Sequence, residues 1–261
     1  MRLTECRACW GLLPHGSFRQ SYRYVEPVRR ADGSLAVLRF GPVDDAEFAV
    51  ELDAAEWFGG HGAVGVLEID RSRGAVLLER ALPGTRLRDL WPDDDEAATA
   101  AAAGVMAALW RPPVADSAFP TVQHWGRLLA PGSRAAGVFF ELCDSMADPV
   151  VLHGDLHHDN ILRSGYDNWL AIDPKGVVGE PAYETGALMR NPFPGLLDAG
   201  DPVRVLRRRA DQLAELLDVD VARVRGWAYA QAVLAGVWSV ADGEDPSFWH
   251  AVAELLEPLV F

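Results

Sequence analysis

Apolar and polar positions follow two different periods along the chain, and the change between them falls near residue 80. Before it, alternating apolar positions predict strands at 22–25, 35–40, 64–69 and 75–78. Helical spacing at 46–58 predicts one helix. Beyond residue 90 the spacing predicts helices at 94–110, 121–130, 134–146, 181–190, 203–217, 220–241 and 246–257. This order predicts an α+β protein with a small antiparallel-sheet domain at 1–80, which contains one helix, and a larger, mainly helical domain at 81–261.

Within the helical part, one segment changes to short apolar runs that enclose polar loops. The run at 149–152 predicts a strand that enters a loop with Asp155, and Asn160 begins a strand that leaves this loop. The partner strand at 169–172 leads back to the same place and ends at Asp173. This spacing matches the catalytic loop and metal ligand of protein kinases. It predicts phosphoryl transfer, which needs a carboxylate beside the substrate hydroxyl and oxygen ligands for magnesium.

Composition narrows the class of protein. The chain has 261 residues, 49% of them hydrophobic and 24% charged, as in ordinary globular proteins large enough for one domain or two lobes. Its net charge of -14 argues against nucleic acid and suits a cationic ligand, although acidity also serves solubility. The longest uncharged apolar run, 97–110, is shorter than the roughly 20 residues of a membrane span. With no recognisable secretion signal and an odd number of cysteines, we expect a cytoplasmic protein of open oligomeric state.

Two segments carry a family resemblance. Residues 152–162 (LHGDLHHDNIL) and 172–180 (IDPKGVVGE) resemble the aminoglycoside phosphotransferase superfamily. His-Gly-Asp occurs in many small-molecule kinases, whereas the Asp-Pro-Lys-Gly run is similar to the streptomycin 6-kinase and hydroxyurea kinase group. The tryptophan-rich stretch 227–243 also looks like the C-terminal helix of that group, and the resemblance covers residues 35–245.

The resemblance implies a bilobal protein-kinase-like fold, with 1–80 as the N-lobe and 81–261 as the C-lobe. It also implies transfer of the γ-phosphate of ATP, with magnesium, to a hydroxyl of a small molecule such as streptomycin or hydroxyurea. Asp155 is then expected to accept or orient the proton of this hydroxyl, and Asn160 and Asp173 to hold magnesium.

Nucleotide contacts are expected mainly from the first domain. In the family, a lysine on the third strand contacts the phosphates, and here Arg39 takes that position, with Glu51 as its expected partner and Glu47 as second choice. The alternative is that Arg39 is a surface residue of an edge strand and that the cation comes from elsewhere in the chain. Ser17, in the loop 15–21, is a weak candidate for covering the phosphates, and backbone groups from Glu79 to Leu82 are expected at the purine edge.

A cationic acceptor needs carboxylates around its ammonium groups. The candidates are Glu180 and Glu184, just after the metal-binding strand, and Asp242, with Glu244 and Asp245 beside it. Each of them is alternatively a solvated surface acid.

Other functions remain open at this point. A pseudokinase or nucleotide-binding module would explain Arg39 and the glycine-poor loop, and a kinase of a sugar or amino alcohol would use the same motif. A metal-dependent hydrolase lacks a second set of ligands. His153, His157, His158 and Asp159 are expected to brace the loop rather than to bind a transition metal, and the pair Cys6 and Cys9 is expected to be free thiols rather than half a zinc site. Asp93 to Glu96 resemble a capped helix start, but the preferred interpretation is a solvated turn.

Overall fold

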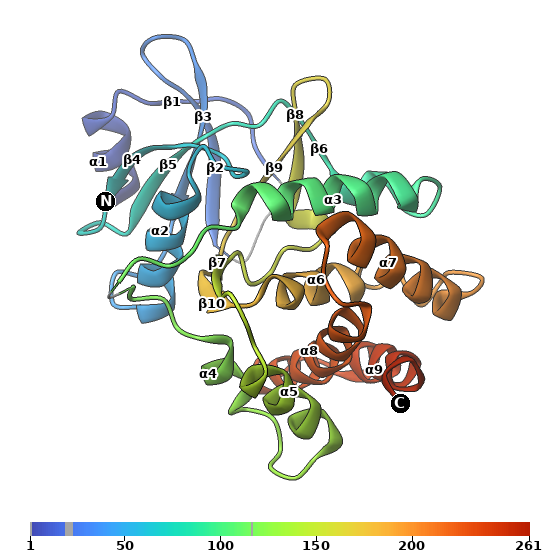
Figure 1. Ribbon diagram of the computed structural model, residues 1–261. Helices are drawn as coiled ribbons and strands as arrows, with labels where there is room; N and C mark the ends of the chain where they lie inside the picture. The colour runs from blue at the N-terminus through green and yellow to red at the C-terminus, as the bar shows by residue number, and fades with distance from the viewer. Residues whose placement is uncertain (1, 19–22, 116) are drawn as a thin grey trace. The chain divides into compact units, whose positions relative to one another are not determined.

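The computed structural model describes residues 2–18, 23–115 and 117–261. The chain forms two compact units (Figure 1). Unit 1 consists of Met1–Thr85 together with Leu162–Lys175, and unit 2 consists of Arg86–Ile161 and Gly176–Phe261. The segment after residue 161, which we expected in the larger domain, belongs to unit 1 because Leu162, Leu170 and Ile172 pack against its apolar core.

Unit 1 is built around an antiparallel sheet, as the sequence pattern predicts. Its strands are β1 (Leu13–Pro14), β2 (Tyr24–Arg29), β3 (Leu35–Phe40), β4 (Val66–Asp70) and β5 (Ala75–Glu79), in the order β1-β2-β3-β5-β4. The helices of this unit are α1 (Arg2–Cys9) and α2 (Ala46–Phe58). The bounds of β3 and α2 are those predicted, whereas α1 and β1 were not predicted. Residue 22, the expected start of β2, lies outside the described residues.

The alternation along β3 explains how both faces of this sheet are covered. Ala36 and Leu38 are fully buried in a cluster with Val28 and Leu77. Val37, between them, packs instead against the cluster that contains Phe48 of α2. Because side chains two positions apart on a strand share a face, Arg39 follows Val37 toward α2.

A second, smaller sheet completes unit 1. It contains β6 (Pro83–Arg86), β8 (Ile161–Ser164) and β9 (Asn168–Ala171), in the order β6-β8-β9. The two strands expected at 160–162 and 169–172 are therefore present as neighbours. Strand β6 was not predicted, because Pro83 and Gly84 indicate a break in a regular strand. Proline is nonetheless tolerated at the start of an edge strand, where its missing N–H costs no ladder hydrogen bond.

Unit 2 is mainly helical. Its helices are α3 (Asp95–Leu109), α4 (Val122–Gly126), α5 (Arg134–Asp144), α6 (Pro181–Met189), α7 (Pro202–Leu217), α8 (Val221–Ala241) and α9 (Ser247–Val260). It also contains the 3-10 helices η1 (Leu87–Leu90) and η2 (His158–Asn160), and the antiparallel pair β7 (Val150–Leu152) and β10 (Val177–Gly179). All seven predicted helices are present. The prediction for α4 was too long, because the chain continues after Gly126 only as turns.

Helix α8 is the centre of unit 2, and it packs against α5, α6, α7 and α9 (Figure 1). Trp227 of α8 is fully buried, and its ring lies 5.0 Å from those of Phe139 and Tyr183. These edge-on aromatic contacts fix α6 and α5 against α8. No helix in the described part of the chain is both long and apolar enough to span a membrane.

The start of α3 differs from the expected solvated turn. Asp95 is buried, and its carboxylate accepts hydrogen bonds from Nη2 of Arg209 at 2.6 Å and from Nε at 2.9 Å. Arg209 on α7 is itself fully buried. A buried guanidinium needs a paired anion, and this requirement draws Asp95 into the interior.

Candidate active site

The loop after β7 turns at a position that only glycine can occupy. Gly154 has a φ of 86°, and a Cβ placed on it would lie 2.7 Å from Cη2 of Trp125. The neighbouring His153 is fully buried, and its Nδ1 accepts a hydrogen bond from the backbone N–H of Asp155 at 3.3 Å. The glycine allows the tight turn, and the histidine holds the residue that follows it.

Glu184 of α6 fixes the same loop from the other side. Its carboxylate is buried and accepts hydrogen bonds from the backbone N–H groups of His153 at 2.6 Å and Gly154 at 2.9 Å. Burial raises the pKa of Glu184 to about 7, although the two backbone hydrogen bonds favour its charged form. We expected Glu184 to meet the acceptor. In the structure its oxygens are enclosed and hold the loop.

The half-buried carboxylate of Asp155 lies beside a cation that sequence reasoning missed. Nη2 of Arg190 donates to its Oδ1 at 3.1 Å, and Nε2 of His157 is 3.6 Å from its Oδ2. Arg190 is buried at the end of α6, with its guanidinium 5.5 Å from the centre of the Trp249 ring. No fixed spacing in sequence connects Arg190 to Asp155, since only the packing of α6 brings them together.

Asn160 is oriented by the loop it ends. Its Nδ2 donates to the backbone carbonyl of Asp155 at 2.9 Å, which leaves the amide oxygen as the atom for a ligand. His157 and Asp159, which lie between Asp155 and Asn160 in the sequence, brace the loop. Nδ1 of His157 accepts from the backbone N–H of Asp159, whose carboxylate pairs with Arg88 at 2.9 Å.

His158 is a fully buried histidine beside Arg209. Its Nε2 lies 3.3 Å from Nη2 of Arg209. Burial, and then the charge of Arg209, hold the pKa of His158 well below its usual value. Among the described residues, no group of three or more His, Cys, Asp or Glu side chains is arranged to hold a metal ion, and the cysteines are free.

In unit 1, Arg39 connects α2 to Asp173, which lies two residues after the end of β9. Its Nη2 donates to Oε2 of Glu51 at 2.7 Å, and its Nη1 lies 3.3 Å from Oδ1 of Asp173. Asp173 has a φ of 57°, a left-handed conformation that is unfavourable for a residue other than glycine. Such strain is common where a side chain must be held in a functional direction.

Glu51 is the centre of a larger charge cluster. Besides Arg39, its buried carboxylate accepts hydrogen bonds from Nζ of Lys175 at 2.7 Å and from Arg23 at 3.1 Å. Burial opposes ionisation of Glu51, but these cations outweigh it and lower the pKa of the carboxyl group. Glu47, our second choice as the partner of Arg39, instead accepts from Lys175 at 2.8 Å.

Ser17, Glu79 and Leu82 are the other residues that we expected to contact the nucleotide. Ser17 is exposed in the connection between β1 and β2, and residues 19–21 of that loop lie outside the described part of the chain. Oε2 of Glu79 accepts from the backbone N–H of Gly65 at 3.2 Å. The carbonyl of Leu82 accepts from the N–H of Gly165 at 2.6 Å, so this oxygen is already used within unit 1.

The remaining acids divide into structural and exposed ones. Glu180, expected at the acceptor, has a buried carboxylate that accepts hydrogen bonds from Nε of Arg223 at 2.8 Å and from the indole of Trp227. The carboxylate of Asp245 accepts from the backbone N–H of Ser247 at 3.0 Å at the start of α9. Asp242 is exposed at the end of α8.

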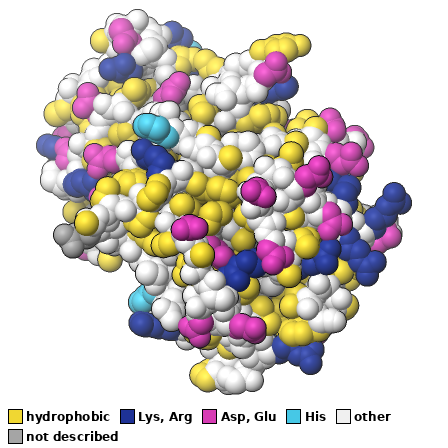
Figure 2. Space-filling view, viewed as in Figure 1, with side chains coloured by type: hydrophobic (Ala, Val, Ile, Leu, Met, Phe, Trp, Pro, Cys, Tyr) yellow, Lys and Arg dark blue, Asp and Glu magenta, His cyan; other side chains and the backbone are white. Residues whose placement is uncertain are grey.

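Both units of the protein contain a hollow. In unit 1, Arg39 and Asp173 border a small hollow whose other walls are apolar, including Val64, Leu78 and Ala171. In unit 2, another hollow runs along α7, where basic side chains gather beside acidic ones (Figure 2).

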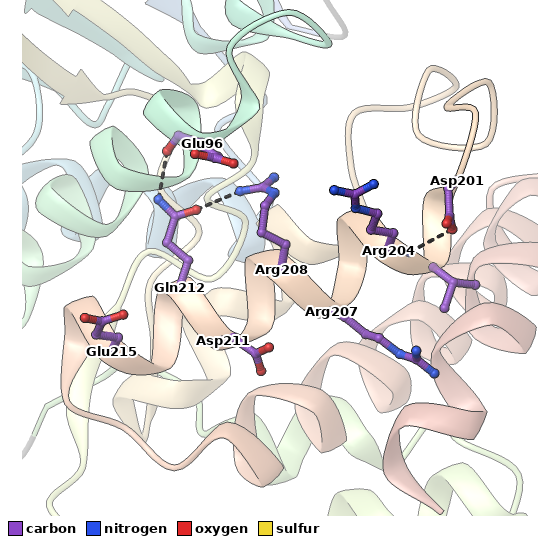
Figure 3. Close-up of a pocket in the computed structure, with 9 residues that line it drawn as sticks. Glu96, Asp201, Arg204, Arg207, Arg208, Asp211, Gln212 and Glu215 are labelled. Carbon is purple, nitrogen blue, oxygen red and sulfur yellow. Dashed lines mark hydrogen bonds between the residues drawn. The ribbon is translucent and has the colours of Figure 1, made fainter.

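The hollow along α7 has the character of a solvated helix surface. Its side chains are held mainly by one another, since Arg208 donates to Gln212 at 2.7 Å and Gln212 donates to the carbonyl of Glu96 at 2.8 Å (Figure 3). It contains none of the residues that carry the kinase motif.

The described residues suit a magnesium nucleotide. Asp173, whose side chain is about two-fifths exposed, and the amide oxygen of Asn160 are hard oxygen donors of the kind that magnesium prefers. Arg39 and Lys175 place positive charge beside Asp173 and Glu51 for an anionic ligand. Thiolate or histidine clusters, which would favour softer metals, do not occur among the described residues.

Comparisons with known proteins agree with this arrangement. The chain is 32% identical to a streptomycin 6-kinase of Streptomyces griseus, over 92% of this chain and 83% of that one. It is 33% identical to a hydroxyurea phosphotransferase of Kitasatospora aureofaciens, over 98% of this chain and 78% of that one. An aminoglycoside phosphotransferase structure from Streptomyces rimosus shares the fold, with a TM-score of 0.58 and 18% identity over 88% of this chain and 96% of that one. Residues 10–243 match the model of one family, and the chain belongs to it: the aminoglycoside/hydroxyurea antibiotic resistance kinases.

Proposed function

We propose that this protein transfers the γ-phosphate of ATP to a hydroxyl group of a small molecule, either an aminoglycoside such as streptomycin or hydroxyurea. One observation carries the proposal: the carboxylate of Asp155 is held in a fixed position. Arg190 donates a hydrogen bond to this half-buried carboxylate, and Glu184 fixes the loop on which Asp155 lies. A carboxylate fixed in this way suits a group that must orient one hydroxyl.

The reaction assigns one role to each residue. Asp155 accepts a hydrogen bond from the acceptor hydroxyl and takes its proton while the hydroxyl oxygen forms a bond to the γ-phosphorus. The bond between this phosphorus and the β–γ bridging oxygen breaks, and ADP leaves. Arg190 positions Asp155, at a distance of 3.1 Å.

Asn160 and Asp173 would hold magnesium, which supplies charge neutralisation at the phosphate oxygens. The chain itself supports this role by fixing both side chains. The hydrogen bond from Asn160 to the backbone of Asp155 directs its amide, and the ion pair with Arg39 directs the carboxylate of Asp173.

Acceptor recognition is assigned to the surface around Arg190. Trp249 lies against its guanidinium, and the ring of Phe193 stacks on Trp249 at 5.5 Å. This aromatic surface favours planar or cationic groups, and exposed Asp242 is a candidate for an ammonium group. The acceptors named for the relatives, streptomycin and hydroxyurea, support this choice, as does a structure of the Streptomyces rimosus enzyme with ADP and streptomycin. Use of ATP, together with free Cys6 and Cys143, suits the cytoplasm.

Substitution of Asp155 tests the assignment of the base. Asp155→Asn keeps the size of the side chain but cannot take a proton, so we expect kcat to fall by at least about a thousandfold. Titration calorimetry should show that Mg-ATP binding remains within about threefold of the wild-type value, or about 0.7 kcal/mol, because Asp155 is assigned to the acceptor hydroxyl and not to the nucleotide. Asp167→Asn, the same change at an exposed turn, serves as the control. Substantial turnover by Asp155→Asn would remove this residue from the reaction.

The acceptor is identified by ATP consumption with a panel of compounds. The panel contains streptomycin, other aminoglycosides, hydroxyurea, simple sugars and amino alcohols. We expect stimulated turnover with streptomycin or hydroxyurea, and the product should carry one phosphate by mass spectrometry. Stimulation only by a sugar or an amino alcohol would assign a metabolic kinase instead.

A further inference from the structure

Lys175 is the single lysine of the chain, although lysine and arginine together number 24. The other 23 of these residues are arginines. An ammonium differs from a guanidinium in being a compact charge with three rotatable donors, so the two are not interchangeable at a crowded site. The position of Lys175 within the charge cluster therefore requires explanation.

The ammonium of Lys175 joins two carboxylates one turn apart on α2. Its Nζ donates to Oε1 of Glu47 at 2.8 Å and to Oε1 of Glu51 at 2.7 Å. An ammonium has three N–H groups, so these contacts leave one N–H for a further acceptor.

Arg39 shares Glu51 with Lys175 but is much less accessible. Its side chain is 8% exposed, whereas that of Lys175 is 34% exposed. Nη2 and Nη1 of Arg39 are directed to Glu51 and Asp173, and its Nε is buried without a partner in the described chain. The guanidinium thus has its donors turned inward, toward protein groups.

Lys175 also lies close in sequence to the candidate metal ligand. It follows Asp173 by two positions, so their Cα atoms are at most about 7 Å apart. A phosphate bound through magnesium at Asp173 is therefore within reach of a lysine side chain that starts on the same short segment. An anion at this place would also be the natural acceptor for the third N–H of the ammonium.

From these contacts we infer that Lys175, rather than Arg39, is the cation that contacts the nucleotide phosphates, with Glu51 holding it in place. Arg39 is a positioning residue that fixes Asp173 and Glu51. The inference rests on the proposed function. It moves the phosphate-binding cation from β3, where the kinase template has it, to the segment that follows the metal ligand.

The single lysine makes a chemical test specific. An ATP analogue with an acyl group on its γ-phosphate transfers this group to a nearby amine, so an amide N–C bond forms, the acyl C–O bond breaks and ATP leaves. Peptide mass spectrometry of the full-length protein should find the label on Lys175 and its loss in the presence of excess Mg-ATP. A label confined to the N-terminal amine would overturn the inference.

Direct binding measurements separate the two cations. We expect Lys175→Met to weaken Mg-ATP binding at least tenfold by titration calorimetry, and Lys175→Arg to weaken it less. Arg39→Lys should change the affinity less than threefold, because a cation still faces Glu51. Arg71→Met is the control, since Arg71 pairs with Asp53 at 2.8 Å and with Glu56 on the exposed side of the same helix.

The outcomes distinguish this inference from the proposed function. If the wild-type protein binds no nucleotide, the proposed function itself fails. If wild type binds Mg-ATP and folded Lys175→Met binds it equally well, only the role of Lys175 fails. Circular dichroism verifies folding of each variant, and Lys175→Arg, which keeps the positive charge, provides a second comparison should the methionine variant be unfolded.

Discussion

At the scale of single residues, the carboxylates of this protein have two different roles. Asp155 is half-buried beside Arg190, Asp173 is partly exposed beside Arg39, and Glu184 is buried against backbone N–H groups. The first two keep oxygen atoms for ligands, whereas the third holds the loop. Burial and partners, rather than the residue type, decide which carboxylate can take part in a reaction.

Glu184 gives the protein a predictable pH dependence. Its pKa in the folded state, about 7, lies above the ordinary value of 4.5. Between these pH values the folded protein keeps a proton that the unfolded chain releases, so the free energy of unfolding falls as the pH rises through this window. The shift corresponds to about 3 kcal/mol.

Glu184→Gln removes this titration and leaves the others unchanged. We expect the stability of wild type relative to the variant to decrease from pH 5 to pH 8, by up to about 3 kcal/mol in urea denaturation. His158, whose lowered pKa acts in the opposite direction below about pH 6.5, contributes equally to both proteins and cancels in the difference. A difference that stays constant with pH would show that Glu184 does not titrate in this range.

At the scale of elements, buried charges specify how helices pack. The contact of α3 with α7 contains the pair Asp95 and Arg209, and Arg209 also donates to the backbone carbonyl of Leu188 at 3.2 Å. Its guanidinium lies 4.9 Å from the centre of the Trp91 ring. A charge in such surroundings is tolerated only while its counterion is present.

Removal of one partner should therefore be costly. We expect Asp95→Ala to lower the free energy of unfolding by about 3–5 kcal/mol, because it leaves Arg209 buried without its anion. The double variant Asp95→Ala, Arg209→Met should recover part of this loss. Asp211→Ala, which breaks the exposed pair between Asp211 of α7 and Arg225 of α8, should cost about 1 kcal/mol or less. Equal costs for the two single variants in urea denaturation would contradict a special role of burial.

Helices and strands are also the features that the sequence predicted most accurately. The bounds of β3 and α2 were predicted correctly, because Leu35–Phe40 alternates and Ala46–Phe58 has helical spacing before two glycines. Strand β6 was missed because Pro83 and Gly84 dominate its local signal, although pairing with β8 stabilises it. Glycine and proline indicate only the local conformational preference of the backbone, and pairing with a neighbouring strand can override that preference.

The candidate site was predictable to the extent that its residues are adjacent in sequence. The spacing of Asp155 and Asn160 identified the loop, whereas Arg190 comes from another segment and was missed. Lys175 follows Asp173 by two positions, but the sequence indicated it only as part of a family motif. Glu180 and Glu184 were assigned to the acceptor because a sequence shows the number of carboxylates but not their burial. The pairing of Glu180 with Arg223 depends on the packing of α6 against α8, which no local pattern contains.

At the scale of the whole molecule, 38 acidic residues against 24 basic ones give a field that attracts cations. The active-site residues use only a few of these charges. A general excess of negative charge acts on the encounter with a ligand more than on its bound geometry. Its effect should therefore depend on the charge of the acceptor and on ionic strength.

This dependence distinguishes the two proposed kinds of acceptor. For a polycationic aminoglycoside, kcat/KM at saturating ATP should fall several-fold between about 0.05 and 0.5 M salt, because the screening length shortens from more than 10 Å to a few Å. For neutral hydroxyurea, the same range of salt should change kcat/KM less than twofold. Any effect of salt on ATP binding is common to both acceptors, so their ratio isolates the attraction of the acceptor. A ratio independent of salt would mean that the negative charge of this protein serves its solubility and not its substrate, and recognition would then rest on the aromatic surface beside Arg190.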